Sequence, residues 1–311
     1  MTRLTTLSGA PVSRFAFGTM QWGGRASVRD AAETYAAARA AGITHFDTAH
    51  IYTDGRAEEL SGERVAAERD EIYVATKVAY AAPATRATLT EQFDLSRQRL
   101  KLDQVDLLYL HRFDAGTPLE ETFEVMAEFQ QAGLIRHIGV SNYAAWQVMK
   151  AQAVCDRLGT RIDAVQPMIS LVKRQAEVEL LPMCADQGIV PVTYSPLGGG
   201  LLTGKYAGGD GSGRLAEDGR YAARYGQDWM AEAAAELARI AAREGTHPAT
   251  LAVAWLARHA PLVHPILSAR TAEQLAPSLD GMIYPLHDAI YREITALSPT
   301  PANATDRIEE R

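Results

Sequence analysis

Four polar side chains in the first part of the chain stand where a packed core would not favour them. Asp47 and Lys77 each end an apolar run, His111 follows a third run, and Tyr52 lies in the loop after Asp47. A tyrosine with its ordinary pKa of about 10 gives up a proton reluctantly at neutral pH. A nearby Lys77 ammonium would lower that pKa, and Asp47 would keep Lys77 charged and in place. Because His111 is able to hydrogen-bond a substrate oxygen, this set of residues predicts proton transfer to an oxygen atom.

Each of these residues also has a purely structural explanation. A single histidine at a strand end is more often a satisfied core group, and Asp47 with Lys77 could form an ion pair that only closes the fold. The combination with Tyr52, all at the same ends of successive strands, favours catalysis. His45 and His50 beside Asp47 also suggest a metal site, but no further ligand at known metal spacing appears on neighbouring strands, so no metal is expected.

Apolar runs that alternate with amphipathic segments must position these residues. The runs are continuously apolar, as in a parallel sheet that is buried on both faces. The strands expected from them cover residues 14–17, 43–47, 72–77, 105–111, 137–140, 164–167, 189–194 and 263–267. Eight strand–helix units in strict alternation predict an α/β fold, the closed (β/α)8 TIM barrel, with its active site at the carboxyl ends of the strands. An open doubly wound sheet is the alternative, but residues 18–24 match its Gly-rich fingerprint poorly.

The barrel is expected to occupy the whole chain, residues 1–311, as a single domain. An N-terminal hairpin is expected over residues 4–13, and the Pro- and charge-rich residues 299–311 should form a flexible tail. Capping residues mark the starts of several helices. The four predicted pairs are Ser27 with Asp30, Thr88 with Glu91, Thr117 with Pro118, and Thr271 with Gln274.

Composition argues against several classes of function. The chain is 47% hydrophobic and has a net charge of −7 with no basic cluster, which argues against a nucleic-acid or membrane-surface partner. Cys155 and Cys184 lack C-x-x-C spacing and are expected to be free buried thiols. The chain contains no signal-peptide core and no apolar run of about 18 residues, so a soluble cytoplasmic protein is expected.

Seven motifs, in the same order along the chain, resemble those of the aldo-keto reductase superfamily. They are Asp47-Thr48-Ala49 with Tyr52, residues 55–62, Thr76-Lys77-Val78, Leu110-His111-Arg112, Gly139-Val140-Ser141-Asn142, Gln166, and residues 194–206. Each motif is weak alone, but together they cover nearly the whole chain. The run from Pro196 to Gly204 is more similar to the bacterial and channel-β-subunit-like branches than to the mammalian aldose reductases.

The resemblance implies an NADP-dependent oxidoreductase that reduces aldehydes or ketones to alcohols by hydride transfer. It gives Tyr52 the role of general acid, makes Lys77 and Asp47 the groups that tune it, and makes His111 the group that orients the carbonyl. The residues that it assigns to NADP(H) are Ser141, Asn142, Gln166, Tyr194, Ser195, Leu197, Gly199, Ser268, Arg270, Gln274 and Ser278.

These cofactor residues divide by position along the dinucleotide. By resemblance, Ser141, Asn142 and Gln166 would hold the nicotinamide carboxamide. Tyr194 would stack on the nicotinamide ring, and the turn at residues 195–201 would follow the pyrophosphate.

The adenosine end departs from the family pattern in two places. Pro277-Ser278 stands where members often have Glu-Asn, and Ser268 stands where some members carry a cation. Arg270, beside a predicted helix start, is therefore the main candidate for contact with the 2′-phosphate. The preference for NADP(H) is expected to be modest.

Substrate residues are expected in the loops around the strand ends. By family position Trp22 lines the substrate pocket, and Tyr80 and Phe113 face the same site. The loops expected to select the small carbonyl substrate are residues 21–26, 113–117 and 206–226.

Two other functions stay open at this point. One is an NADP-binding regulatory subunit with little turnover, like the potassium-channel β-subunits of the superfamily. The other is an isomerase or aldolase on the same barrel. The sequence makes no prediction of the oligomeric state.

Overall fold

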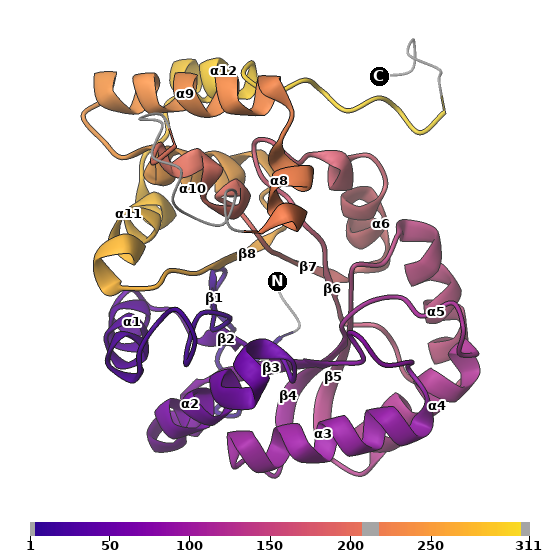
Figure 1. The fold of residues 1–311 in the computed structure, drawn as a ribbon. Coiled ribbons are helices and arrows are strands. Elements are labelled where there is room, and N and C mark those ends of the chain that lie inside the picture. Colours follow the sequence, from indigo (N-terminus) through magenta and orange to yellow (C-terminus); the bar gives the residue numbers. More distant parts are fainter. Residues whose placement is uncertain (1–3, 207–217, 306–311) are drawn as a thin grey trace.

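Eight parallel strands close into a barrel in the computed structural model, which describes residues 4–206 and 218–305 (Figure 1). Each strand pairs with the next in the chain, and β1 pairs with β8 to close the ring. The strands are β1 (Ala16–Gly18), β2 (His45–Asp47), β3 (Tyr73–Val78), β4 (Val105–Leu110), β5 (Ile135–Ser141), β6 (Ala164–Gln166), β7 (Val190–Thr193) and β8 (His264–Leu267). The predicted eightfold α/β barrel is confirmed.

Helices surround the strands on the outside of the barrel (Figure 1). The α-helices are α1 (Val28–Ala40), α2 (Arg56–Val65), α3 (Arg86–Leu100), α4 (Leu119–Gln131), α5 (Ala145–Arg157), α6 (Leu180–Gln187), α8 (Gly219–Tyr225), α9 (Asp228–Arg243), α10 (Pro248–His259), α11 (Ala272–Ile283) and α12 (Asp288–Thr295). Short 3-10 segments are η1 (Tyr52–Gly55), η2 (Ala66–Glu71), η3 (Gln175–Glu177) and η4 (Gly198–Thr203). None of the helices that the structure describes is both long and apolar enough to cross a membrane.

Parts of two predicted segments lie outside the described residues. Residues 207–217 belong to the predicted specificity loop, and residues 306–311 belong to the predicted tail. The described part of the tail, residues 299–305, forms neither helix nor strand.

Two of the predicted helix caps are confirmed by their hydrogen bonds. The Ser27 side chain accepts from the Asp30 amide, and the Asp30 side chain accepts from the Ser27 amide, which makes the expected capping box. At the start of α11, the Thr271 hydroxyl accepts from the Gln274 amide at 3.2 Å. Four residues, 268–271, therefore connect the end of β8 to the start of α11.

The other two predicted caps are wrong. Helix α3 starts earlier than expected, because Thr85 is its cap and accepts from the amide of Thr88. Thr117 does not cap α4, since its hydroxyl donates to Asp114 at 2.7 Å and Pro118 occupies the capping position. At α3 two threonines lie close together and the loop geometry selects the first, whereas α4 begins without a side-chain cap.

Helix α12 was not expected from the sequence. Ile294 is buried in it, and Ile290 and Tyr291 pack beside the same core. The indole of Trp255 on α10 donates to Thr295 at 2.9 Å and fixes the end of α12. Short length and a preceding proline-containing loop made this helix hard to distinguish from the tail.

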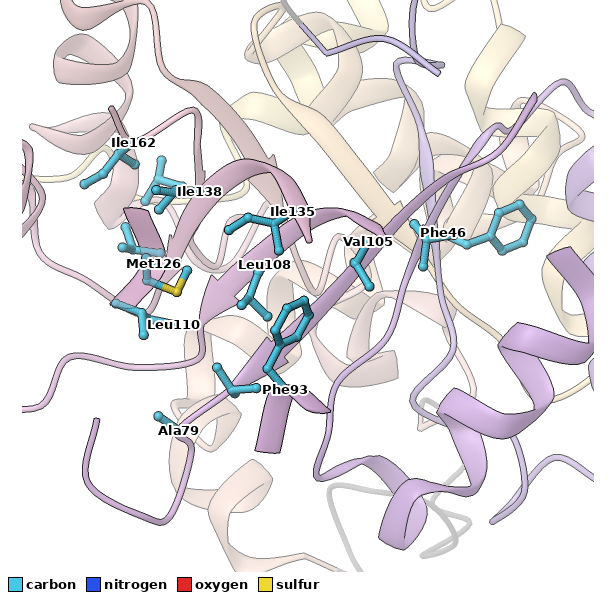
Figure 2. Packing of buried hydrophobic residues seen from close by; sticks show 14 of the residues in the cluster. Phe46, Ala79, Phe93, Val105, Leu108, Leu110, Met126, Ile135, Ile138 and Ile162 are labelled. Atoms are coloured by element: carbon cyan, nitrogen blue, oxygen red, sulfur yellow. The ribbon is translucent and has the colours of Figure 1, made fainter. Parts of the chain in front are cut away.

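The largest hydrophobic core lies between the outer faces of the strands and the helices. Figure 2 shows Phe93 from α3 packed with Val105 and Leu108 from β4. The inward stripe of α3 consists of Leu89, Phe93, Ser96 and Leu100. Burying a side chain of this size stabilises the fold by about 1.5–3 kcal/mol. This layer of packed side chains therefore holds β3 and β4 in place.

Two tyrosines fill the barrel interior beneath the strand ends. Tyr73 and Tyr109 are fully buried and belong to an interior cluster with Ala75 and Ala164. Gly139 makes room for Tyr109, because a Cβ atom at this position would lie 2.4 Å from the tyrosine ring. The interior is therefore packed, and a ligand can reach the strand ends only from the loop side.

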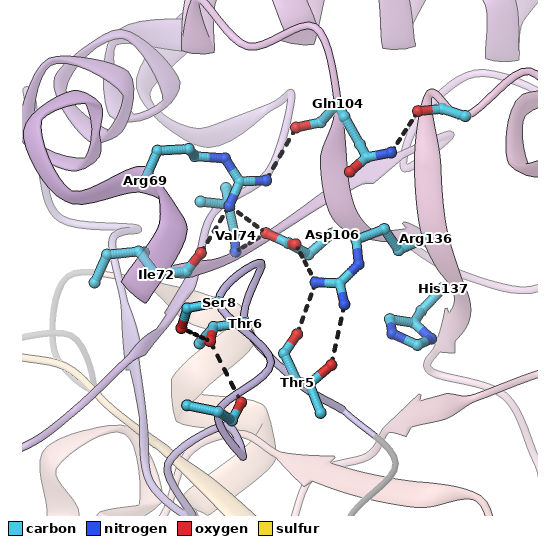
Figure 3. A network of polar contacts seen from close by, with 12 residues as sticks. Thr5, Thr6, Ser8, Arg69, Ile72, Val74, Gln104, Asp106, Arg136 and His137 are labelled. Carbon is cyan, nitrogen blue, oxygen red and sulfur yellow. Dashed lines mark hydrogen bonds and ion pairs between the residues drawn. The ribbon is translucent and has the colours of Figure 1, made fainter.

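A polar network closes the opposite end of the barrel (Figure 3). The carboxylate of Asp106 is fully buried and binds Arg69 and Arg136, each at 2.8 Å. Arg136 also donates to the carbonyl oxygen of Thr5 at 2.7 Å. Thr5 pairs with Pro11 in the N-terminal hairpin, so the predicted hairpin is held against the amino ends of β4 and β5.

Candidate active site

The ends of β2 and β3 place Asp47 and Lys77 side by side. The Lys77 side chain is fully buried and hydrogen-bonds Oδ1 of Asp47. Its ammonium also donates to the Thr48 carbonyl at 2.7 Å and to the Tyr52 hydroxyl at 3.3 Å. Burial lowers the pKa of Lys77, but the Asp47 carboxylate and Tyr52 outweigh burial and raise it. With three acceptors for its three N–H donors, Lys77 stays charged.

Tyr52 opens the 3-10 segment η1 and points its hydroxyl at Lys77. Burial raises the pKa of this phenol, the Lys77 ammonium lowers it, and Asp47 raises it again. The net direction is upward, which corrects the expectation of a lowered pKa. The contribution of Lys77 has the expected sign, but burial is larger. Tyr52 therefore holds its proton at neutral pH and has one to give.

His111 directly follows β4 and lies next to Tyr52. The two ring centroids are 5.9 Å apart in an edge-to-face arrangement, and the Tyr80 ring lies 4.7 Å from His111 on another side. Burial, with a smaller effect of Lys77, lowers the pKa of His111 to about 2. A neutral imidazole carries one N–H and is able to donate it to an uncharged substrate oxygen.

A cavity of about 220 Å³ opens beside these residues. Its walls come from three loops, from the end of β3 and from α3. The wall residues are His50, Ile51, Lys77, Val78, Ala79, Tyr80, Ala81, Ala82, Gln92 and His111. A larger open hollow lies elsewhere, between α9 and the segment after α12, and no predicted catalytic residue lines it. Depth and chemistry thus single out the smaller cavity as the candidate substrate site.

Predicted cofactor residues form a hydrogen-bonded chain that ends at Asp47. Tyr194 donates to Oδ1 of Asn142 at 2.6 Å, and Asn142 donates to Ser141 at 3.1 Å. The Ser141 hydroxyl donates to the backbone carbonyl of Gln166 at 3.0 Å. The Gln166 amide then donates to Oδ2 of Asp47 at 2.9 Å. The structure thus brings the predicted nicotinamide residues and the acid–base residues into one network.

The turn after β7 provides the predicted pyrophosphate residues. Ser195 has a φ of +62°, and Gly199 and Gly200 have φ values of +67° and +101°. Consecutive residues of this kind turn backbone N–H groups toward one side and suit an anion. Tyr221 from α8 packs against Gly199, where a Cβ atom would lie only 2.8 Å from the ring. Leu197 is half-buried against the surrounding core.

The start of α11 provides the predicted 2′-phosphate residues. Ser268 and Gln274 are exposed, and Arg270 between them is partly exposed. Within residues 4–206 and 218–305, Arg270 forms no ion pair, so its guanidinium is available. A helix N-terminus beside a free guanidinium fits a phosphate group.

Ser278 does not belong to that surface. Its side chain is only 2% exposed, and the neighbouring Pro277 carbonyl accepts from Thr250 of α10 at 2.8 Å. This face of α11 packs against α10. The structure thus places Ser278 in this packing contact, apart from the exposed surface of Ser268 and Gln274.

Trp22 is also misplaced in the sequence interpretation. Its indole is fully buried, donates to Thr34 at 3.0 Å and packs 5.5 Å from the Phe17 ring. It fills the core between the barrel and α1 and does not line the substrate cavity. Tyr80 does line the cavity, whereas Phe113 packs edge-on against Tyr143.

Among the wall residues that the sequence interpretation did not assign to the cavity, two are polar. His50 stands two positions before Tyr52 in the same loop, and this proximity is the signal that could have identified it. Gln92 accepts from the Ala79 amide at 2.8 Å, a contact that no local sequence pattern predicts. Within the described residues, no group of three or more His, Cys, Asp and Glu side chains is arranged to hold a metal ion.

Comparisons with known proteins show the family to which the chain belongs. The sequence model of the Aldo/keto reductase family matches residues 14–299. The chain is 32% identical to a probable voltage-gated potassium channel subunit beta of Arabidopsis thaliana, over 86% of each protein. It is 30% identical to the uncharacterized oxidoreductase YrpG of Bacillus subtilis, over 96% of each. It is 36% identical to aflatoxin B1 aldehyde reductase member 2 of Rattus norvegicus, over 72% of this chain and 62% of that protein. The chain belongs to the aldo/keto reductase family.

Proposed function

We propose that this protein reduces aldehydes or ketones to alcohols with NADPH and uses Tyr52 as the general acid. One observation carries the proposal. Lys77 binds Asp47 and also lies 3.3 Å from the Tyr52 hydroxyl, at the edge of a cavity that His111 lines as well. A neutral phenol beside a fixed cation is suited to give a proton to a carbonyl oxygen that becomes an alkoxide.

The four residues divide the chemistry of the step. Tyr52 gives the proton from its hydroxyl to the substrate oxygen. Lys77 stabilises the phenolate that remains, and Asp47 holds Lys77 charged and in position. The neutral N–H of His111 orients the carbonyl oxygen before the proton moves.

NADPH would supply the hydride when it is bound. Ser141, Asn142 and Gln166 present amide and hydroxyl groups of the kind that recognise a carboxamide. The Tyr194 ring offers a surface for stacking. Arg270 offers a positive charge for the 2′-phosphate, which distinguishes NADPH from NADH. A hydrogen-bonded network joins the four nicotinamide candidates to Asp47 and supports their assignment to the cofactor.

A second function rests on a specific observation. The similarity to plant proteins named as potassium channel subunits makes an NADP-binding subunit with little turnover the alternative. The two functions share the cofactor site and differ in whether the acid–base residues act during turnover. The intact set of Asp47, Tyr52, Lys77 and His111 supports the enzyme.

The test is NADPH oxidation measured over a panel of aldehydes, ketones and sugars. Wild type should turn over part of the panel. Tyr52→Phe should lower kcat by ~10²–10⁴-fold, the usual contribution of a general acid. NADPH affinity, measured by fluorescence quenching, should be unchanged in this variant. Tyr284→Phe, at the far end of α11, is the matched control and should behave as wild type.

The outcomes separate the alternatives. NADPH binding without turnover on any carbonyl would favour the subunit. Near-normal turnover of Tyr52→Phe would remove Tyr52 as the acid. Failure to bind NADPH would contradict both functions.

A further inference from the structure

A buried ion pair lies directly behind the loop that carries Tyr52. Glu58 of α2 is 0% exposed, and its Oε1 accepts from the Thr76 hydroxyl at 2.6 Å. Its Oε2 accepts from Nη1 of Arg99 on α3 at 3.3 Å. A lone carboxylate is strongly disfavoured inside a protein, so Glu58 depends on both partners. Thr76 precedes Lys77 on β3, which anchors the pair on the strand that carries the active-site cation.

Arg99 also contacts the loop that carries Tyr52. Its Nη1 donates to the backbone carbonyl of His50 at 3.1 Å. The guanidinium lies against Gly55, where a Cβ atom would be 2.3 Å from its Cζ atom. Gly55 also has a φ of +94°, so both its backbone and the space above it require glycine. Arg99 thus contacts the loop on both sides of Tyr52.

The loop needs such support because part of it is strained. Thr53 and Asp54 have φ values of +47° and +54°, which a β-branched residue such as threonine rarely adopts. Strain of this kind persists only where the surroundings hold the backbone. The Thr53 hydroxyl donates to the Trp22 carbonyl at 2.8 Å and supplies one such contact. The same hydroxyl accepts from the Ala57 amide at 3.0 Å, and Arg99 supplies further contacts at His50 and Gly55.

We propose that Arg99, backed by Glu58, is a positioning residue that holds the Tyr52 hydroxyl beside Lys77. The ion pair adds a side-chain link between the strand of Lys77 and the loop of Tyr52. It acts beside the backbone hydrogen bond from the His50 amide to the Lys77 carbonyl at 3.0 Å and contributes to the position of the Tyr52 hydroxyl. The effect expected on kcat rests on the proposed function, in which Tyr52 gives the proton. The structural part concerns only the position of the phenol.

The first test is Arg99→Lys. Lysine keeps a positive charge for Glu58, but its nitrogen ends one bond short of Nη1, the atom that contacts both Glu58 and the His50 carbonyl. Lysine also lacks the planar group that lies against Gly55. We expect kcat to fall by roughly 10–100-fold, because small misplacements of a reacting group have effects of this size. The substrate KM, the NADPH Kd and the thermal midpoint should stay near the wild-type values.

Arg97→Lys is the matched control on the same helix. Arg97 pairs with Asp94 at 2.9 Å and makes no contact with the Tyr52 loop among the described residues. This variant should keep the wild-type kcat. A loss of kcat equal to that of Arg99→Lys would overturn the proposal.

A second readout does not need turnover. The Tyr52 resonance can be followed against pH in protein made with isotopically labelled tyrosine and identified by its absence in Tyr52→Phe. The groups that act on this phenol are Lys77, Asp47, Tyr221, Tyr194 and His111. If Tyr52 moves away from Lys77, the contribution that lowers its pKa weakens, and the phenol should titrate at higher pH in Arg99→Lys than in wild type.

This readout separates the two proposals. A shifted Tyr52 titration in a protein that reduces no carbonyl would support the positioning role and contradict the proposed function. If Arg99→Lys does not fold, Glu58→Gln replaces it, because glutamine still accepts from Thr76 and leaves Arg99 without its ion pair. It should shift the Tyr52 titration upward and lower kcat. A folded variant with unchanged titration and unchanged kcat overturns the proposal.

Discussion

The Gln166 amide donates to Oδ2 of Asp47 at 2.9 Å, while Oδ1 of the same carboxylate binds the Lys77 ammonium. A single buried carboxylate therefore joins the predicted nicotinamide site to the group that tunes Tyr52. Any ligand that reorients Gln166 changes the hydrogen bonding of Asp47 and, through it, the environment of Lys77. In the proposed function, cofactor binding and proton transfer both depend on the hydrogen bond between Gln166 and Asp47.

Lys77→Met should abolish reduction and also destabilise the fold. The substitution leaves the Asp47 carboxylate buried without its cation, a change that typically costs about 3–5 kcal/mol. Urea unfolding of the variant measures this loss. The double variant Asp47→Asn with Lys77→Met should be less destabilised than Lys77→Met alone, because it removes the unpaired charge as well. Equal loss in both would show that the pair contributes through packing only.

The cost of Lys77→Met should depend on pH. Burial raises the pKa of Asp47, and Lys77 opposes that rise, so the variant raises the folded-state pKa further. A carboxyl with a raised folded pKa keeps stability at low pH and loses it as pH rises above its unfolded value of about 4. The difference in unfolding free energy from wild type should therefore be largest near neutrality and shrink toward about pH 4. A constant difference would contradict the role of Asp47.

Two buried histidines and one half-buried histidine should make the fold sensitive to acid. Burial lowers the pKa of His45 to about 3, of His264 to about 4 and of His111 to about 2. Each is neutral in the fold and takes up a proton on unfolding below its ordinary pKa of about 6.5. Stability is thus present above that pH and falls as pH decreases, by up to ~1.4 kcal/mol per pH unit for each histidine.

His45→Leu tests this sensitivity to acid. Neither ring nitrogen of His45 has a hydrogen-bond partner among the described residues, so an apolar side chain of similar size loses no such contact. The variant should be at least as stable as wild type at neutral pH, with a shallower acid slope in unfolding measurements. An unchanged slope would show that other groups set the acid limit.

The barrel and the catalytic set followed from local sequence patterns. Largely apolar strands alternate with amphipathic helices, and Asp47, Lys77 and His111 are polar residues at or next to the carboxyl ends of successive strands. For that reason Asp47, Lys77 and His111 could be placed together before any contact was known. The hydrogen bonds among Ser141, Asn142 and Gln166 agree with their predicted grouping.

The errors concern the direction of single side chains, which depends on tertiary packing. Trp22 lies in a loop near the site, yet its ring turns into the core toward Phe17. Ser278 occupies the face of α11 that meets α10. The pKa of Tyr52 was expected to fall because the sequence places Lys77 near it. Burial of the phenol, which depends on tertiary packing, has the larger effect and raises the pKa.

Trp22→Phe should separate its core role from a role in substrate binding. Phenylalanine loses the hydrogen bond to Thr34 and part of the packing, which should cost about 1–3 kcal/mol in unfolding free energy. KM values across the carbonyl panel should stay unchanged. Tyr80→Ala is the comparison, since Tyr80 lines the cavity beside His111 and should change KM with little loss of stability. A specific change of KM in Trp22→Phe would restore its predicted role.

Cofactor choice should depend on Arg270. Arg270 lies just before α11, which Thr271 caps. The backbone N–H groups of the first helical turn are therefore available as donors beside the guanidinium. A charged hydrogen bond to the 2′-phosphate contributes ~1.5–3 kcal/mol, or about 10–100-fold in affinity. Wild type should prefer NADPH to NADH by about this factor in fluorescence titrations. Arg270→Ala should weaken NADPH by a similar factor and leave NADH nearly unchanged.

Ser268→Arg provides the opposite change at the same site. Ser268 is exposed two residues before Arg270, so a second guanidinium there should strengthen NADPH binding and widen the preference. Added salt should reduce the preference in wild type and in Ser268→Arg, because exposed charges are screened. In Arg270→Ala the salt effect should nearly disappear. If wild type binds both cofactors equally, or if Arg270→Ala weakens both to the same extent, Arg270 does not read the 2′-phosphate, and the role of Tyr52 is unaffected.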